Sequence, residues 1–224
     1  MKRSVITFVS FFMVLSLFLV SPSKPEATSL EPISGSFNLD DLELMEEKGE
    51  VIVEELTYEE FIQERAADKG ISITEARKMY KNPYVDSKGT QLLAANSYFM
   101  LKINIIQDVG FFYKPAITVY AWTYTSNSFR EMKYIEEVVL DRDGVNDSYT
   151  AKGFEGKIRA KLTTSTSVWW LINGDFYHQG EMTFTGGIGG TFATIGKEVQ
   201  LNGSVTRKID HYTYFDDDGT HYIY

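Results

Sequence analysis

Two kinds of hydrophobic pattern divide the chain. Between residues 57 and 80, apolar residues recur every three or four positions, which is the period of an amphipathic helix. From Tyr98 onward, apolar and polar residues alternate one by one, as in the stretch 99–105. This alternation is typical of half-buried antiparallel strands. The pattern therefore predicts a helical region followed by a β domain.

The helical region carries its own start and stop signals. Thr57 and Glu60 have the spacing of a capping box, and Gly70 can end the helix in a left-handed conformation. A second, shorter helix is expected to begin after Ser72 or Thr74 and to stop before Pro83. The apolar stripe of the first helix consists of Tyr58, Phe61, Ile62, Arg65 and Ala66. A further acidic helix is expected over residues 39–48.

The β domain is predicted from runs of alternation with turn signals between them. Beyond the first run at 99–105, the runs lie at 117–124, 132–140, 155–162, 168–172, 181–185, 191–195, 198–205, 209–215 and 221–224. Asn173-Gly174 and Asp218-Gly219 are among the expected turns. Roughly nine or ten short strands indicate an antiparallel β-sandwich, with a barrel as the alternative. The predicted fold class is mainly β, preceded by a short acidic helical hairpin.

The N-terminus has the three parts of a secretory signal peptide. A basic start at Met1–Arg3 precedes the apolar stretch 5–20, and small residues follow from Ser21 to Ala27. Cleavage is expected after Ser23 or after Ala27. The alternative, an uncleaved anchor, would need roughly 20 apolar residues to span a bilayer. We therefore expect a secreted, extracellular protein with a signal peptide at 1–27, a helical region and join at 28–95, and a β domain at 96–224.

Composition narrows the classes of partner and chemistry. The 224 residues carry a formal net charge of −9 and include no cysteine. The absence of cysteine excludes disulfides, thiol nucleophiles and cysteine metal sites. Between residues 31 and 80 there are fourteen acidic and five basic side chains, so the acidity is concentrated in the helical region. This balance argues against nucleic acid, and we do not expect the membrane to be a partner once the signal peptide is removed.

The combination of these features resembles a loose group of small, exported, β-rich proteins of Gram-positive bacteria whose function is unknown. The resemblance is carried by the signal peptide, by Tyr58-Glu59-Glu60-Phe61-Ile62, by Lys69-Gly70-Ile71-Ser72 and by Glu75-Ala76, with an all-β remainder. It covers the first eighty or so residues. It implies secretion and a β-rich fold, and it brings no catalytic residue with it.

Aromatic residues give the first candidate site. Tyr120, Trp122 and Tyr124 share one face of a predicted strand, about 6.7 Å apart, and flat rings in a row can stack against sugars. Trp169 and Trp170 are neighbours, so one must face the opposite side of its strand from the other. The alternative is that large aromatic side chains serve the core, with one face of the sheet covered by the second sheet and the other by the N-terminal helices.

Oxygen ligands give the second candidate site. Asp141, Asp143 and Asp147 alternate around Gly144, which suits a calcium ion, although a strand-joining turn explains the same residues. No other cofactor is expected. His211 and His221 could also meet across the predicted turn at Asp218-Gly219 and bind a metal with a nearby carboxylate.

We predict a non-enzymatic binding protein for an extracellular or cell-surface ligand, such as a glycan. The chain has no His-Glu-x-x-His, Gly-x-Ser-x-Gly, P-loop or dinucleotide-binding motif. One alternative is a membrane-active pore former built around Thr183–Thr206, a stretch rich in threonine and glycine with amphipathic strands. A second alternative is a secreted hydrolase that uses a pair of carboxylates.

Overall fold

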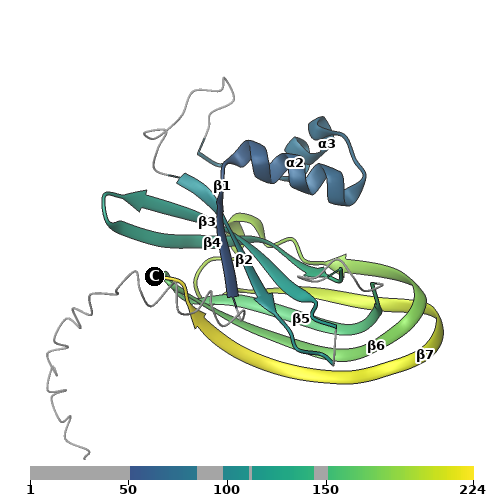
Figure 1. Cartoon of the computed structure of the whole chain (residues 1–224). Coiled ribbons are helices and arrows are strands. Elements are labelled where there is room, and N and C mark those ends of the chain that lie inside the picture. The colour runs from purple at the N-terminus through teal and green to yellow at the C-terminus, as the bar shows by residue number, and fades with distance from the viewer. Residues whose placement is uncertain (1–50, 85–97, 111–112, 144–150) are drawn as a thin grey trace, which may run out of the picture. The chain divides into compact units, whose positions relative to one another are not determined.

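The strands form two antiparallel sheets that enclose a common core (Figure 1). The computed structural model describes residues 51–84, 98–110, 113–143 and 151–224. The predicted signal peptide and the predicted helix at 39–48 lie outside these residues, as do most of the expected join and Asp147. All the described residues belong to one compact unit.

The first sheet has the strand order β1-β2-β3-β4. Its strands are β1 Val51–Leu56, β2 Tyr98–Ile106, β3 Ala116–Ser126 and β4 Phe129–Asp141. The strand β1 was not predicted, because it lies within the region expected to be helical, yet it pairs along its length with β2. The segment before the helices is therefore part of the β structure.

The second sheet is built from β5 Gly153–Thr164 and from a long hairpin of β6 Ser167–Gly186 and β7 Glu198–Tyr222. One edge of β5 pairs with the first half of β6, and the other edge pairs with residues 198–203 of β7. Register shifts after Phe176 and Gln179 mark the place where the hairpin changes course. Each of its strands thus contributes two segments, and the sheet is five segments wide without closing into a barrel.

Two of the predicted turns are wrong. Asn173-Gly174 lies inside β6, and Asp218-Gly219 lies inside β7. Gly174 instead faces Gly156 of β5, and a Cβ at Gly156 would come within 2.2 Å of the Asn173 carbonyl oxygen. The glycines are needed because backbones and the Phe154 ring approach closely there, a use of glycine that sequence spacing does not distinguish from a turn.

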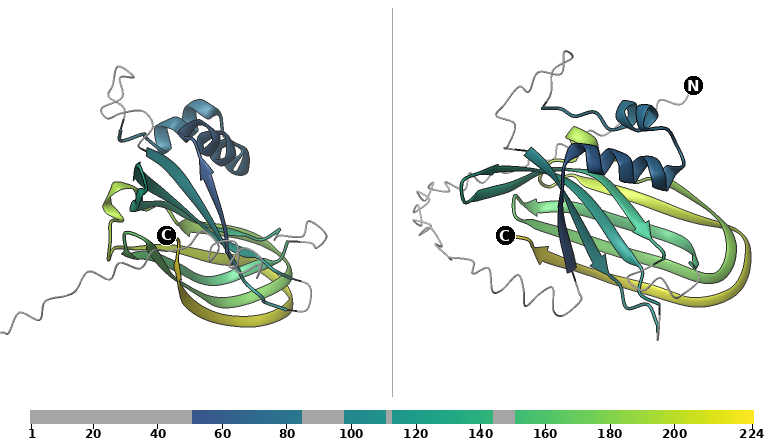
Figure 2. Two further views of the ribbon diagram at one scale, coloured as in Figure 1. Left: turned by 60° about the vertical axis from the view of Figure 1, so that its left-hand side comes forward. Right: turned by 45° about the horizontal axis from the view of Figure 1, so that its top comes forward.

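The core between the sheets confirms the predicted sandwich. Apolar side chains from both sheets form one buried cluster, and the alternating positions of the first predicted run, residues 101, 103 and 105, are fully buried in it. Members from the first sheet include Ile103, Val119 and Ile135, and members from the second include Ile158, Ile172 and Leu201. Figure 2 shows the two layers from two further sides.

The loop between β6 and β7 connects the two sheets. It includes the short 3-10 helix η1 Gly190–Phe192. The Val138 amide donates to the Gly187 carbonyl at 2.7 Å, and the Ile135 amide donates to the Ala193 carbonyl at 3.1 Å. The loop therefore lies along the outer edge of β4 and satisfies backbone groups that an edge strand would otherwise expose.

The two helices form where the sequence predicts them. The first, α2, spans Tyr58–Lys69, and the second, α3, spans Ile73–Met79. Both capping boxes are present, and Gly70 has a φ of 61° at the end of α2. The buried face of α2 consists of Phe61, Ile62, Arg65 and Ala66, as the apolar stripe predicts. These side chains pack with Met100, Tyr120 and Trp122 on the face of the first sheet that is turned away from the core.

Candidate functional site

Two members of the predicted aromatic row, Tyr120 and Trp122, lie beneath the helices, whereas Tyr124 is half-buried beside the rings of Tyr98 and Phe129. Tyr120 and Trp122 are only 1% and 2% exposed. The Phe61 ring of α2 lies 5.2 Å from the Tyr120 ring, and the Tyr58 ring lies 6.1 Å from the Trp122 ring. Because the helices cover Tyr120 and Trp122, these two rings pack against α2 and are not available to stack against a ligand. The alternative expectation is therefore correct: the N-terminal helices cover this face of the sheet.

A buried ionic network fastens α2 to this face. Arg65 donates to the Tyr120 hydroxyl at 2.8 Å, and its Nε lies 2.9 Å from Oε2 of Glu137 on β4. Lys69 Nζ lies 2.9 Å from the other oxygen of the same carboxylate. Glu137 is therefore neutralised by two cations of one helix. Removing one partner of a buried ion pair is strongly destabilising, because it leaves the other charge without compensation.

The neighbouring Glu136 has a different environment. The register of β3 with β4 shifts between Tyr120 and Ala121, and Glu136 is the extra residue of the resulting bulge. Its Oε2 accepts a hydrogen bond from the Trp122 indole at 3.0 Å. Burial raises the pKa of Glu136 to about 7, and the charge of Glu137 adds to this effect while the Trp122 bond opposes it. The only sequence signal for this position is a Glu-Glu pair inside an apolar run.

The two adjacent tryptophans face opposite sides of β6, as predicted. Trp170 is 5% exposed and belongs to the core between the sheets, where it stacks on His221 with ring centroids 6.2 Å apart. Trp169 is half-buried and lies on the outer face of the second sheet. Of the three tryptophans in the two predicted aromatic groups, Trp169 is therefore the one that a ligand can reach.

Polar and charged side chains surround Trp169. Its ring lies 4.7 Å from Lys161 Nζ and 5.8 Å from the Arg159 guanidinium. Arg159 is held by both oxygens of Glu198, at 2.5 and 2.6 Å. The strand register adds Leu171, Asn173, Gln200, Asn202 and Thr220 to the same face. We call this set, together with Trp169, the Trp169 face.

The residues predicted to bind calcium are only partly described. Asp141 ends β4, and its carboxylate accepts a hydrogen bond from the Asp143 amide at 3.0 Å. Both side chains are exposed. Asp147 lies outside the described residues, so calcium binding stays a prediction. Among the residues that are described, no group of three or more histidine and acidic side chains is arranged to hold a metal ion.

The predicted meeting of His211 and His221 is wrong. Both histidines lie on β7, opposite Tyr177 and Val168 of β6 respectively. Ten residues of extended strand span about 33 Å, so the two rings cannot share a ligand. His211 instead pairs with Asp175, with its Nε2 2.8 Å from the carboxylate. The error follows from the false turn at Asp218-Gly219.

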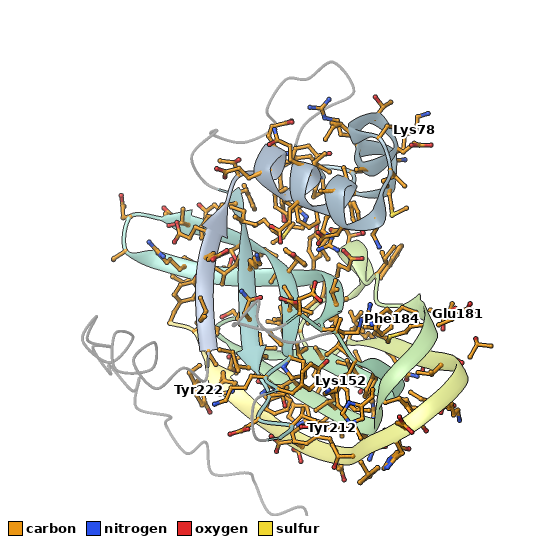
Figure 3. The ribbon with its side chains drawn as sticks, turned by 45° about the vertical axis from the view of Figure 1, so that its right-hand side comes forward. Lys78, Lys152, Glu181, Phe184, Tyr212 and Tyr222 are labelled. Atoms are coloured by element: carbon orange, nitrogen blue, oxygen red, sulfur yellow. The ribbon has the colours of Figure 1, made fainter. Side chains whose placement is uncertain are left out.

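The structure also brings together a cluster that the sequence did not suggest. Lys152 lies beside Tyr212 (Figure 3), with its Nζ 4.3 Å from that ring centroid and 5.1 Å from the Tyr113 centroid. The same Nζ is 3.3 Å from Nδ1 of His178. Desolvation lowers the pKa of Lys152. These residues come from distant parts of the chain, which is why no sequence spacing reveals them.

Comparison with known protein families, with curated proteins and with solved structures finds no match for this chain. Within the described part of the chain, no helix has the length and apolar character needed to cross a bilayer.

Proposed function

We propose that this chain is a secreted, non-enzymatic binding protein, and that the Trp169 face takes a glycan on a cell surface or in the extracellular medium. The observation that carries the proposal is the contrast between two neighbours. Trp170 fills the core, whereas Trp169 lies on the outer face with the Lys161 and Arg159 cations over its ring.

The chemistry of the Trp169 face suits a sugar. A sugar presents an apolar face of C–H groups, which packs on an aromatic ring, and hydroxyl groups, which need donors and acceptors around the ring. Asn173, Gln200 and Asn202 supply both donors and acceptors. The ion pair of Arg159 with Glu198 holds two further polar groups in fixed positions near the ring. The strand register also places Lys157, Asp216 and Asp218 on this face. The cations Lys157, Arg159 and Lys161 are thus matched by Glu198, Asp216 and Asp218, so the face fits a ligand with little net charge.

The test compares two aromatic substitutions. The full chain is applied to a glycan array and to isolated bacterial cell walls, beside Trp169→Ala and Phe129→Ala. Phe129 is a matched control because it is 54% exposed at the start of β4, in the other sheet. We expect Trp169→Ala to weaken binding at least tenfold, as the loss of about 1.4 kcal/mol of stacking would, and Phe129→Ala to leave it unchanged.

Two results would contradict this proposal. One is that the wild-type protein binds none of the glycans and no wall material. The other is that Trp169→Ala binds as well as the wild type while keeping the same melting temperature.

A second candidate function is favoured by the tip of the long hairpin. Ile188, Phe192 and Ile195 are 49%, 87% and 51% exposed in the loop between β6 and β7. No charged residue occurs between Met182 and Gly196. Exposed apolar loops of this kind can enter a lipid surface, so a membrane-active protein is the alternative.

Dye release from vesicles separates the two candidates. A membrane-active protein would release a trapped dye and form oligomers that resist detergent, and Phe192→Ser would abolish the release. A protein that stays monomeric and releases no dye would eliminate the second candidate, and it would leave the glycan proposal as it stands.

A further inference from the structure

Two adjacent carboxylates on β4 are buried with different partners. Glu137 is 2% exposed and is contacted by Arg65 and Lys69. Glu136 is 5% exposed, and its hydrogen bond comes from a neutral indole. Within the described residues Glu136 forms no ion pair. A carboxylate removed from water without a cation is costly, so its place in the fold requires an explanation.

Aromatic rings occupy the space where a cationic side chain would be expected. Trp122 and Tyr134 are buried, and Tyr58 and Tyr84 are half-buried. The Trp122 ring lies 6.1 Å from the Tyr58 ring and 5.3 Å from the Tyr84 ring. Burial is the main cause of the raised pKa of Tyr58, Tyr84 and Tyr134, and the charge of Glu136 adds to it in all three. Tyr134 lies directly opposite Trp122 in the strand register, so the three tyrosine rings gather around Trp122, whose indole donates to Glu136. We call these four aromatic residues and the carboxylate the Glu136 cage.

A second polar group in the cage also has an unused hydrogen-bonding capacity. The Tyr134 hydroxyl is buried, in a residue that is 4% exposed, and it has no hydrogen-bond partner among the described residues. Buried hydroxyls are nearly always paired, so this hydroxyl has capacity left for a ligand or a water molecule.

We propose that the Glu136 cage binds a small organic cation carrying an amine or quaternary ammonium group. The faces of aromatic rings are negative and attract such cations, and tryptophan is the strongest of them. Glu136 supplies the countercharge, and the Tyr134 hydroxyl can accept a hydrogen bond from a primary or secondary ammonium. Tyr58 and Tyr84 form the solvent side of the cage because they are its half-buried members.

Other ligand classes fit the cage less well. A calcium ion needs six to eight oxygen ligands, whereas the cage offers one carboxylate and tyrosine hydroxyls. An anion would be repelled by Glu136. A neutral apolar molecule would leave the Glu136 charge without compensation. The proposal does not depend on the Trp169 face, which lies on the other sheet.

The cage also predicts how binding depends on pH. The groups that act on Glu136 are the Trp122 indole, which donates a hydrogen bond to it, and the charge of Glu137. The charge of Glu136 in turn helps to raise the pKa of Tyr58, Tyr84 and Tyr134. The three tyrosines have raised pKa values and stay neutral, and Glu137 is paired with Arg65 and Lys69. Glu136 is then the group that titrates, with a pKa of about 7. Because its ionised form attracts the cation, affinity is expected to rise roughly tenfold from about pH 6 to pH 8.

The experiment uses choline and dimethylbutanol, its uncharged carbon isostere, as probes for the full chain. Calorimetry at pH 8 is expected to give a Kd for choline on the order of 1 mM and at least tenfold weaker binding of the isostere. Glu136→Gln should remove this preference. Glu55→Gln is the matched control, since it removes one negative charge from an exposed position on the same sheet, and it should bind choline as the wild type does.

Further variants separate a lost site from a lost fold. Tyr84→Ala removes a ring from the solvent side and should weaken choline binding at least threefold even if Glu136→Gln failed to fold. Trp169→Ala should bind choline normally, because it tests the glycan proposal alone. The proposal would be overturned if the wild type bound choline and its isostere equally well, or if it bound no choline. It would also be overturned if Glu136→Gln kept the wild-type preference for choline.

Discussion

At the scale of single residues, a buried arginine joins the helices to the sheet. Arg65 is 3% exposed and contacts Tyr120, Glu137 and Asp68. Its position on the apolar stripe of α2 was predicted from the sequence. Its partners on β3 and β4 were not, because pairing between residues so far apart in the chain depends on how the helix is placed on the sheet.

Removing this arginine should be costly. Arg65→Ala leaves Glu137 buried with Lys69 as its remaining cation, so we expect a loss of about 3–5 kcal/mol in the free energy of unfolding. Arg77→Ala is the control, because Arg77 pairs with Glu59 at the surface, where water and salt screen the pair and it contributes little to stability. Urea denaturation of both variants checks the expectation, and equal losses would show that the buried network contributes no more than a surface pair.

Glu136 should make stability depend on pH in the direction opposite to that of most carboxylates. Its pKa is about 7 in the folded protein and lower in the unfolded chain, so the folded state binds more protons between these values. Stability contributed by protonated Glu136 is lost as the pH rises through 7. Glu136→Gln should therefore be more stable than the wild type at pH 8–9 by about 1–3 kcal/mol and nearly equal to it at pH 4. Denaturation midpoints across pH measure this, and a difference independent of pH would contradict it.

At the scale of elements, local capping determines where the helices begin. Thr57 and Ser72 each accept a hydrogen bond from the backbone amide three residues ahead, and Glu60 and Glu75 complete the two boxes. Because these interactions are local, the sequence predicted the start of α2, and it left Ser72 and Thr74 as the choices for α3, of which Ser72 is the cap. The strands of the second sheet were predicted less well, because the length of a strand depends on the partners along it.

A cap substitution should have a moderate, local effect. Thr57→Ala is expected to cost about 1 kcal/mol of stability, since it removes the acceptor for the Glu60 amide. Amide hydrogen exchange should accelerate in the first turn of α2, while the strands of the second sheet exchange as before. A loss of protection across both sheets would instead show that the cap supports the whole fold.

The paired glycines at 156 and 174 should be far more sensitive than a glycine in an open loop. A Cβ at Gly156 would lie 2.2 Å from the Asn173 carbonyl oxygen and 2.9 Å from the Phe154 ring. Gly156→Ala is therefore expected to lower the free energy of unfolding by roughly 3 kcal/mol or more through overpacking. Gly190→Ala is the comparison, because Gly190 has a φ of 59° and open space around it, so only a backbone strain of about 1 kcal/mol is expected. Thermal melts of both variants test the difference.

At the scale of the whole molecule, the described residues should unfold as one unit. The core is shared by both sheets, and the loop between β6 and β7 is bonded to β4. Far-ultraviolet circular dichroism and tryptophan fluorescence should therefore give coincident denaturation curves. Trp122 reports on the helix-covered face, whereas Trp170 reports on the core between the sheets. Two separate transitions would show that α2 and α3 detach before the sheets unfold.

The sequence by itself determined the class of fold, both helices and the core-facing side of the runs at 99–105, 155–162 and 198–205. These features follow from period and local capping, which act over a few residues. The tertiary structure alone decided that the helices cover Tyr120 and Trp122, that Gly174 lies within a strand, and that the Glu136 carboxylate accepts a hydrogen bond from Trp122. Such contacts join residues far apart in the chain, and their energies depend on packing that no short stretch of sequence contains.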